Sequence, residues 1–268
     1  MNIDMNHLKK LYSQNVNIIS YLKENFSQEY KDTDFIKISY DLQSGSYVKY
    51  AKGHPDFIEN YSNTLSDIFN KFEFRSIMEA GIGEATTFSN VLKKLKNSSI
   101  TSLGFDLSYS RLLYAKKYFS EINPNLDTSM FMGDLFNIPL TDNSVDLVYT
   151  SHSVEPNGGH EVEALTELYR VVNKYLILIE PAWEMASEEA RNRMLKMGYV
   201  TDLKQTAIDL GYNVVDHFLL GVETNPLNPT AVLIIKKNAS ATAAKANFTC
   251  PLSQSPLQKL GNVYYSPK

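Results

Sequence analysis

Apolar runs of strand length alternate with helical patterns through the middle of the chain, and this alternation constrains the fold more than any other feature. The runs occupy residues 74–80, 100–105, 128–132, 145–150 and 174–179. Helical patterns separate them at 84–96, 108–121 and 160–172. Strands that alternate with helices predict βαβ units, a parallel sheet and right-handed crossovers.

The order of elements changes after Glu180 and Pro181. A long helical pattern covers 186–210, and two strand-like runs follow it at 212–221 and 230–237. The loop between these two runs suits an antiparallel pair and is a poor parallel crossover. We therefore predict an α/β fold with a seven-stranded, mostly parallel sheet, an antiparallel last strand and helices on both faces.

The regions on either side of this alternation differ from it in composition. Residues 1–72 are polar, rich in Tyr, Asn and Lys, and carry short helical patterns. We interpret them as an N-terminal helical extension or lid, followed by the α/β domain at 73–238. Residues 239–268 begin as a small, polar linker, and the rest is too short to bury a core alone.

The bulk composition is that of an ordinary globular protein, with 43% hydrophobic and 21% charged residues. A net charge of -4 gives no reason to expect nucleic acid as a partner. The single cysteine, Cys250, cannot form an intramolecular disulfide, which fits a reducing compartment. The N-terminus lacks the apolar core of a secretory signal, and no apolar run approaches the roughly 18 residues of a membrane span. We therefore predict a cytoplasmic protein without a membrane association.

A glycine loop, "EAGIGEATTF", follows the first predicted strand. Gly81 and Gly83 stand where the strand turns into a helix, and glycine there permits unusual φ values and the close approach of a ligand. A dinucleotide fingerprint would have Gly or Ala where Thr86 stands, and a phosphate loop would need Gly-Lys-Ser/Thr. The carboxylate of Glu79 would repel a pyrophosphate but suits the ammonium group of an amino-acid moiety. The loop therefore favours a ligand with less negative charge than NAD.

Two further acidic residues end the next two predicted strands. Asp106 stands 23 residues after Gly83, close to the spacing at which an acid binds ribose hydroxyls. It can also cap the helix that starts near Tyr109, and the two roles can coexist. Asp134 ends the third strand, where a carboxylate can accept from the exocyclic amine of adenine while Leu135 packs on the ring.

These motifs together resemble the class I S-adenosylmethionine-dependent methyltransferases, including the ubiquinone/menaquinone methyltransferases. The resemblance covers about residues 72–237 and rests on "MEAGIGEATTF", "GFDLS", "GDLFNIPLTDNSVDLVYTSHSVE" and "LYRVVNKYLILIEP". It implies a Rossmann-like fold, S-adenosyl-L-methionine as cofactor and S-adenosyl-L-homocysteine as product. We predict no metal-binding residues. The resemblance also implies a set of cofactor-binding residues: Glu79, Gly81, Gly83, Asp106, Leu107, Asp134, Leu135 and Ser151. One departure is Ala85, where many members have a third glycine.

In this family the acceptor lies above the carboxyl ends of the fourth and fifth strands. The fourth strand ends in "YTSHSVEPNGGHE", and we predict His152 as general base or acceptor contact and Glu155 as the residue that binds an amine or hydroxyl group. A histidine here can instead merely pack or form hydrogen bonds, and Glu155 can be an ordinary loop carboxylate. Further residues are predicted to bind the substrate or form a lid: Tyr40, Gln43, Tyr47, Asn157, Trp183 and Arg191.

The leading interpretation is methyl transfer to a small polar acceptor, with a sugar-like molecule as its finer form. A tRNA, rRNA or protein methyltransferase is the first alternative, and a catalytically silent scaffold that binds the cofactor is the second. The tail "CPLSQSPLQKLGNVYYSPK" resembles the first half of a small zinc-ribbon-related domain that partners or is fused to some methyltransferases. With one cysteine, no structural zinc site is expected there.

Overall fold

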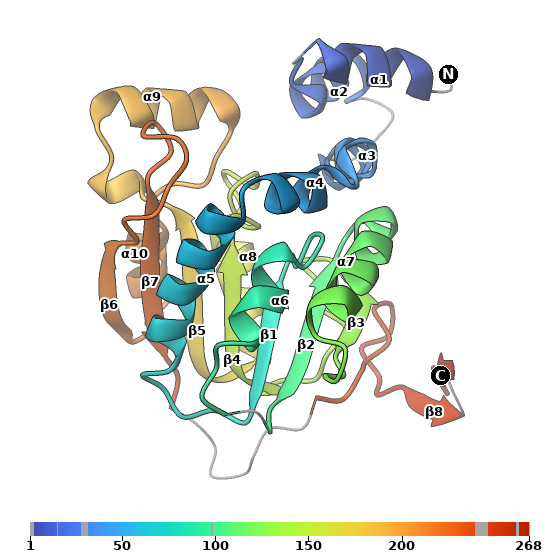
Figure 1. Cartoon of the computed structure of the whole chain (residues 1–268), viewed down its shortest axis with the longest axis vertical. Coiled ribbons are helices and arrows are strands. Elements are labelled where there is room, and N and C mark those ends of the chain that lie inside the picture. The colour runs from blue at the N-terminus through green and yellow to red at the C-terminus, as the bar shows by residue number, and fades with distance from the viewer. Residues whose placement is uncertain are drawn as a thin grey trace.

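The computed structural model describes residues 3–14, 16–27, 32–97, 99–238, 246–260 and 263–267. Its centre is a seven-stranded sheet with the strand order β3-β2-β1-β4-β5-β7-β6 and helices on both faces (Figure 1). The strands of this sheet are β1 (Ser76–Ala80), β2 (Thr101–Asp106), β3 (Ser129–Met132), β4 (Val145–Ser151), β5 (Val172–Pro181), β6 (Val214–Leu219) and β7 (Thr230–Lys236).

The direction of the strands confirms the predicted fold. Strands β1 to β5 run parallel to one another, and β7 pairs antiparallel with both β5 and β6. From β1 the chain passes to β2 and β3 on one side of the sheet, and then crosses to β4 on the other side. The carboxyl ends of β1, β2 and β4 therefore flank a topological switch point, where open α/β sheets bind their ligands.

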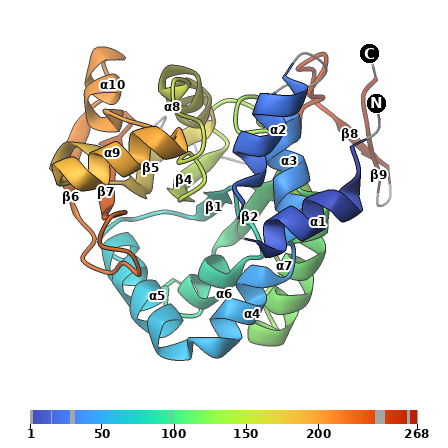
Figure 2. The same ribbon diagram turned by 90° about the horizontal axis from the view of Figure 1, so that it is seen from above.

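Two layers of helices enclose this sheet (Figures 1 and 2). The first layer is α5 (Pro55–Phe69), α6 (Thr86–Leu92) and α7 (Tyr109–Ile122), and the second includes α8 (Glu161–Val171) and α10 (Leu203–Asp209). Alternate side chains of each buried strand face the two layers. In β5, Ile177 and Ile179 join the core under α5–α7, whereas Leu176 and Leu178 join the core under α8 and α10.

The N-terminal helices lie above the carboxyl edge of the sheet (Figures 1 and 2). They are α1 (Met5–Ser13), α2 (Ile18–Phe26), α3 (Asp32–Gln43) and α4 (Ser46–Gly53). Leu8, Leu22 and Phe35 form the centre of a small core among the first three helices. Gly45, with φ of 91°, provides the left-handed turn between α3 and α4. This turn places Tyr40 and Tyr47 at the edge of the sheet below.

The sequence predicted one long helical region at 186–210, but the structure has two separate helices there, so this prediction was wrong in its continuity. After a 3₁₀ turn, η1 (Trp183–Met185), α9 (Glu188–Met197) ends at Gly198, which has φ of 70°. The N–H groups of Gly198 and Tyr199 return to the carbonyls of Leu195 and Met194, a common way for glycine to end a helix. The helix therefore stops before Tyr199, which lines a pocket together with His152 and Glu155.

The described part of the tail packs against the sheet near β3. The ring of Phe248 lies 5.0 Å from that of Phe131, and the N–H of Thr141 donates to the carbonyl of Asn247. A two-stranded hairpin follows, β8 (Gln258–Leu260) and β9 (Val263–Tyr265). Residues 239–245 of the predicted linker lie outside the described residues. Within the described ranges no group of three His, Cys, Asp or Glu side chains is placed to hold a metal ion, and no helix is both long and apolar enough to cross a membrane.

Candidate active site

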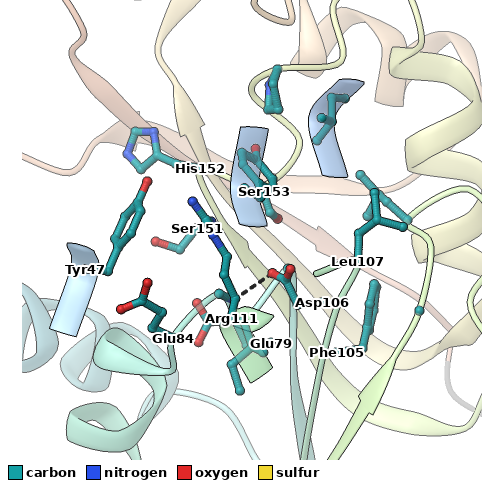
Figure 3. A pocket seen from close by; sticks show the side chains of 18 of the residues that line it. Tyr47, Glu79, Glu84, Phe105, Asp106, Leu107, Arg111, Ser151, His152 and Ser153 are labelled. Atoms are coloured by element: carbon teal, nitrogen blue, oxygen red, sulfur yellow. Dashed lines mark hydrogen bonds between the residues drawn. The ribbon is translucent and has the colours of Figure 1, made fainter. Parts of the chain in front are cut away.

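A pocket of ≈ 940 Å³ opens at the switch point of the sheet (Figure 3). Every residue predicted to bind the cofactor lines it: Glu79, Gly81, Gly83, Asp106, Leu107, Asp134, Leu135 and Ser151. We call this space the cofactor pocket. The fold brings these residues together because the carboxyl ends of parallel strands meet at one edge.

Gly81 is a position that only glycine fits. Its φ is 76°, and a Cβ atom added there would lie 2.2 Å from the Cβ of Ser153. Ser153 is itself fixed, since its hydroxyl donates to the carbonyl of Ala80 over 2.6 Å. The loop therefore presses against the end of β4, and its backbone is exposed to the pocket.

The N–H groups of the glycine loop are used within the protein. Gly81 and Ile82 both donate to the carbonyl of Phe105, over 2.9 and 2.8 Å. Gly83 donates to Oδ2 of Asp106 over 2.9 Å. These bonds hold the loop in shape, but they leave three N–H groups unavailable to a ligand.

Asp106 is buried at the end of β2 and ties two segments together. Its carboxylate accepts from the N–H groups of Gly83 and Ser108, the latter over 2.8 Å. A carboxylate has about four acceptor positions, so two remain for ribose hydroxyls. Burial raises the pKa of Asp106, with these hydrogen bonds and Arg111 opposing the rise. The alternative that Asp106 caps α7 is wrong, because Ser108 is the N-cap and accepts from the N–H of Arg111.

Glu79 is buried at the end of β1. Tyr149 of the adjoining strand donates its hydroxyl to Oε2 of Glu79 over 2.8 Å. Burial raises the pKa of Glu79 to about 8. A cation that enters the pocket would favour the ionised form, so this acid suits an ammonium group.

The part of the pocket beyond the carboxyl end of β3 is lined by apolar side chains and one carboxylate. Leu135, Phe136 and Phe105 line it, and Oδ1 of Asp134 accepts from the N–H of Phe136 over 2.9 Å. A Cβ at Gly133 would lie 2.9 Å from the Phe105 ring, so the chain passes close beside this ring. An aromatic base can pack between these side chains while Asp134 accepts from its amine.

His152 stands just beyond β4 with both ring nitrogens engaged. Its φ of 56° is unusual for a residue with a side chain, and its N–H donates to the carbonyl of Ile179. Nδ1 is hydrogen-bonded to Oε2 of Glu155, and Nε2 lies 3.0 Å from Oγ1 of Thr230. Burial acts to lower the pKa of His152, but the Glu155 carboxylate outweighs it and raises the pKa above its usual value.

Glu180, at the end of β5, supports this loop and was not predicted as a site residue. Its carboxylate accepts from the N–H groups of Ser153, Val154 and Glu155 over 3.0 to 3.2 Å. Burial raises the pKa of Glu180 to about 7. An acid at the end of a strand was the available signal, as it was for Asp106.

The predicted lid residues Tyr40, Gln43 and Tyr47 belong to one stretch, residues 40–48, which comprises the end of α3, the turn after it and the start of α4. We call this stretch the lid segment. Tyr40 and Tyr47 line the pocket, and the guanidinium carbon of Arg111 lies 4.0 and 4.8 Å from their ring centroids. Gln43 does not line the cofactor pocket; its Oε1 accepts from Arg111 over 3.3 Å. Each of these contacts ties the lid segment to α7.

Glu84 anchors the same segment to the glycine loop and was also missed. Its two carboxylate oxygens accept from the N–H groups of Gly45 and Val48, each over 2.7 Å. The side chain is buried and stabilises the first turn of α4. The sequence places these partners 39 and 36 residues apart, so spacing offered no signal.

Trp183 and Arg191 do not fit their predicted role as acceptor contacts. Nε and one terminal nitrogen of Arg191 donate to the carbonyls of Trp183 and Glu184, both over 2.9 Å. These bonds hold the turn before α9, and neither side chain is among the described residues that line the pockets around His152. Asn157 does line the cofactor pocket, and its amide donates to the carbonyls of Ser153 and Val154.

Comparison with known proteins gives a family match and a fold match. Residues 77–175 match a family described as "Methyltransferase domain". No curated protein is similar in sequence to the chain at a significant level. Magnesium protoporphyrin IX methyltransferase from Synechocystis PCC 6803, solved with bound SAH, has a similar structure at 13% identity and a TM-score of 0.58. The match covers 78% of this chain and all of that one.

Two more solved structures have the same fold. A putative methyltransferase in complex with the Trm112 methyltransferase activator of Haloferax volcanii is 13% identical, with a TM-score of 0.54 and coverage of 74% of this chain and 96% of that one. The [4+2]-cyclase SpnF is 14% identical, with a TM-score of 0.53 and coverage of 66% and 80%. The chain therefore carries a methyltransferase domain at 77–175 and the Rossmann-like fold seen in S-adenosylmethionine-dependent methyltransferases, and together these findings confirm the predicted enzyme class and cofactor.

Proposed function

We propose that this enzyme methylates a small polar acceptor that binds beside His152. The observation that carries the proposal is a second pocket of ≈ 1020 Å³ that shares Tyr47, Ser151 and His152 with the cofactor pocket. We call it the acceptor pocket. A methyl donor and its acceptor must lie in contact and in line, and two pockets that meet at His152 provide this arrangement.

The lining of the acceptor pocket suits a neutral or cationic molecule with hydroxyl or amino groups. Tyr50, Phe57 and Tyr61 give this pocket an aromatic part of its lining, and Glu223 and Asn228 are among its polar lining residues. No lysine or arginine stands among the described residues that line it, so an anionic acceptor would be without a counter-charge. Aromatic rings combined with carboxylate and amide groups in one lining favour a sugar-like or amine acceptor.

His152 has the surroundings of a general base. S-adenosylmethionine, when bound, supplies an electrophilic methyl group. The Glu155 carboxylate favours the tautomer that carries a proton on Nδ1, and this leaves Nε2 to accept a proton from the acceptor. The Thr230 hydroxyl lies 3.0 Å from Nε2, which supports this role, because an acceptor's hydroxyl or amino group at a similar position would be within hydrogen-bond distance of Nε2. The cofactor-binding roles proposed for the other residues are Glu79 toward the ammonium, Asp106 toward the ribose, and Asp134 with Leu135 toward the adenine.

The proposal is tested by an acceptor screen that measures release of S-adenosylhomocysteine. Neutral sugars, amino sugars and small amines form one arm, and phosphorylated sugars and prenyl diphosphates form the other. Turnover is expected in the first arm, and His152→Ala should reduce it about 10²- to 10⁴-fold, the usual contribution of a general base. Turnover confined to the anionic arm would contradict the proposal.

A macromolecular acceptor is the second candidate, because the tail forms a hairpin with exposed apolar side chains. Leu260 is 73% exposed, and Tyr264 and Tyr265 are each 44% exposed. Such a surface can dock a partner or a protein substrate. Methylation of bulk tRNA or of a peptide library, lost in Tyr264→Ser, would favour this candidate. Binding of S-adenosylhomocysteine without turnover of any acceptor would favour a silent scaffold.

A further inference from the structure

Arg111 lies inside the cofactor pocket with unused hydrogen-bonding capacity. It stands near the start of α7, and the residue is only 5% exposed. In Figure 3 it extends between Tyr47 and Asp106. Its Nε is buried and has no hydrogen-bond partner among the described residues, and its contact with Gln43 is a long one of 3.3 Å. A buried guanidinium with a free donor is costly unless a ligand pairs with it.

The guanidinium lies over the glycine loop. A Cβ atom added at Gly83 would lie 3.8 Å from Nη1 of Arg111, so the guanidinium group lies close to the backbone of this glycine. The N–H groups of Gly81, Ile82 and Gly83 are all donated within the protein. These three donors of the loop cannot hold an anionic group, and Arg111 is positioned to do so.

The charges of the pocket support the same conclusion. Among its described lining residues Arg111 is the only lysine or arginine, whereas Glu79, Glu84, Asp106 and Asp134 are acidic. The amino-acid end of the cofactor carries one ammonium and one carboxylate. Glu79 suits the ammonium, and a planar guanidinium is the group that pairs best with a carboxylate.

We infer that Arg111 binds the α-carboxylate of the cofactor. This inference rests on the cofactor assignment and adds a residue that the glycine-loop and strand-end motifs do not contain. When the carboxylate pairs with Arg111, the guanidinium remains stacked between Tyr40 and Tyr47, which are residues of the lid segment. Binding of the amino-acid end therefore orders the lid segment as well as holding the ligand.

The test compares two ligands that differ in the carboxylate alone. S-adenosylhomocysteine and its decarboxylated analogue, 5′-(3-aminopropyl)thioadenosine, are titrated calorimetrically into the wild type, Arg111→Met and Arg111→Lys. Lys116→Met, an exposed position on the same helix, is the matched control. The wild type should bind S-adenosylhomocysteine about 10- to 100-fold more tightly than the analogue, the range for a charged hydrogen bond.

Arg111→Met should remove this preference, with Arg111→Lys retaining part of it and the control all of it. If Arg111→Met loses affinity for both ligands to the same extent, the inference is overturned and Arg111 is a structural residue. Tighter binding by Arg111→Met would also overturn it, since Arg111 would then obstruct the site. The preference of the wild type for S-adenosylhomocysteine over the decarboxylated analogue is measured without any variant. If the wild type shows no such preference, the inference is overturned even when Arg111→Met does not fold. Binding of neither ligand by the folded wild type would instead contradict the cofactor assignment.

Discussion

Glu79 and Tyr149 face each other across β1 and β4, and the tyrosine hydroxyl donates to the carboxyl group over 2.8 Å. This contact places a buried acid among the residues that line the cofactor pocket. Burial raises its pKa to about 8, so near neutral pH the free protein holds Glu79 mostly protonated. A ligand with an ammonium group must displace that proton.

Binding of S-adenosylhomocysteine should therefore tighten as the pH rises from 6 to 8. The ammonium lowers the pKa of Glu79, so below pH 8 binding releases a proton, and affinity changes by up to about tenfold per pH unit. Above pH 8 the dependence levels off. Calorimetry in two buffers of different ionisation enthalpy counts the proton. Glu79→Gln should bind more weakly and with no such dependence, and a flat profile in the wild type would contradict the assignment.

Replacing Glu155 should lower the pKa of His152. Burial acts to lower this pKa, and the Glu155 carboxylate is the main group that raises it. In Glu155→Gln the burial effect remains and the charge is lost, so the imidazole becomes neutral at a lower pH. NMR titration of the His152 ring, assigned with His152→Asn, measures this directly. Thr230→Val is the control and should leave the raised pKa in place; an unchanged titration in Glu155→Gln would refute the pairing.

Glu84→Gln should release the lid segment. A carboxamide offers one acceptor in place of two, so either Gly45 or Val48 loses its partner at a cost of about 1–3 kcal/mol. Hydrogen exchange of the amides at 45–48 should accelerate, and binding of S-adenosylhomocysteine should weaken. The exposed Glu121, paired with Lys52, provides Glu121→Gln as the control. Unchanged protection at 45–48 would show that the segment is held by other contacts.

Gly81→Ala should lower the free energy of unfolding by more than the positive φ of Gly81 alone explains. Gly211 has φ of 75° and an open surrounding, whereas a Cβ at Gly81 meets Ser153 at 2.2 Å. Gly211→Ala should therefore lower the free energy of unfolding by about 1–2 kcal/mol. Gly81→Ala should lower it further and also abolish binding of S-adenosylhomocysteine, as chemical denaturation and calorimetry would show. Equal costs for the two variants would mean that the loop can move away from β4.

The strand-end acids were predictable because a parallel sheet brings the carboxyl ends of its strands to one edge. Glu79, Asp106 and Asp134 each stand at the end of an apolar run. The run predicted a strand, and the acid at its end predicted a polar contact with a ligand at the carboxyl edge of the sheet. His152 and Glu155 were found by the same reasoning at the end of β4. In each case the local sequence predicts both the strand and the place of the following side chain at the carboxyl edge of the sheet.

Contacts between the N-terminal helices and the rest of the α/β domain were not predictable in this way. Glu84 meets Gly45, and Arg111 meets Gln43, across long stretches of chain with no shared periodicity. Arg191 appeared suited to an anion from its charge, yet nearby carbonyls of its own turn accept its hydrogen bonds. Such partners depend on how separately formed elements dock, which composition and spacing do not contain.

The most direct test of the account is calorimetric titration of S-adenosylhomocysteine and NAD into the wild type and into Asp106→Ala. The wild type should bind S-adenosylhomocysteine in the micromolar range and show no binding of NAD. Asp106→Ala should weaken that binding by about tenfold or more, since the ribose loses a charged acceptor. Preference for NAD, or an affinity for S-adenosylhomocysteine that does not depend on Asp106, would contradict the account.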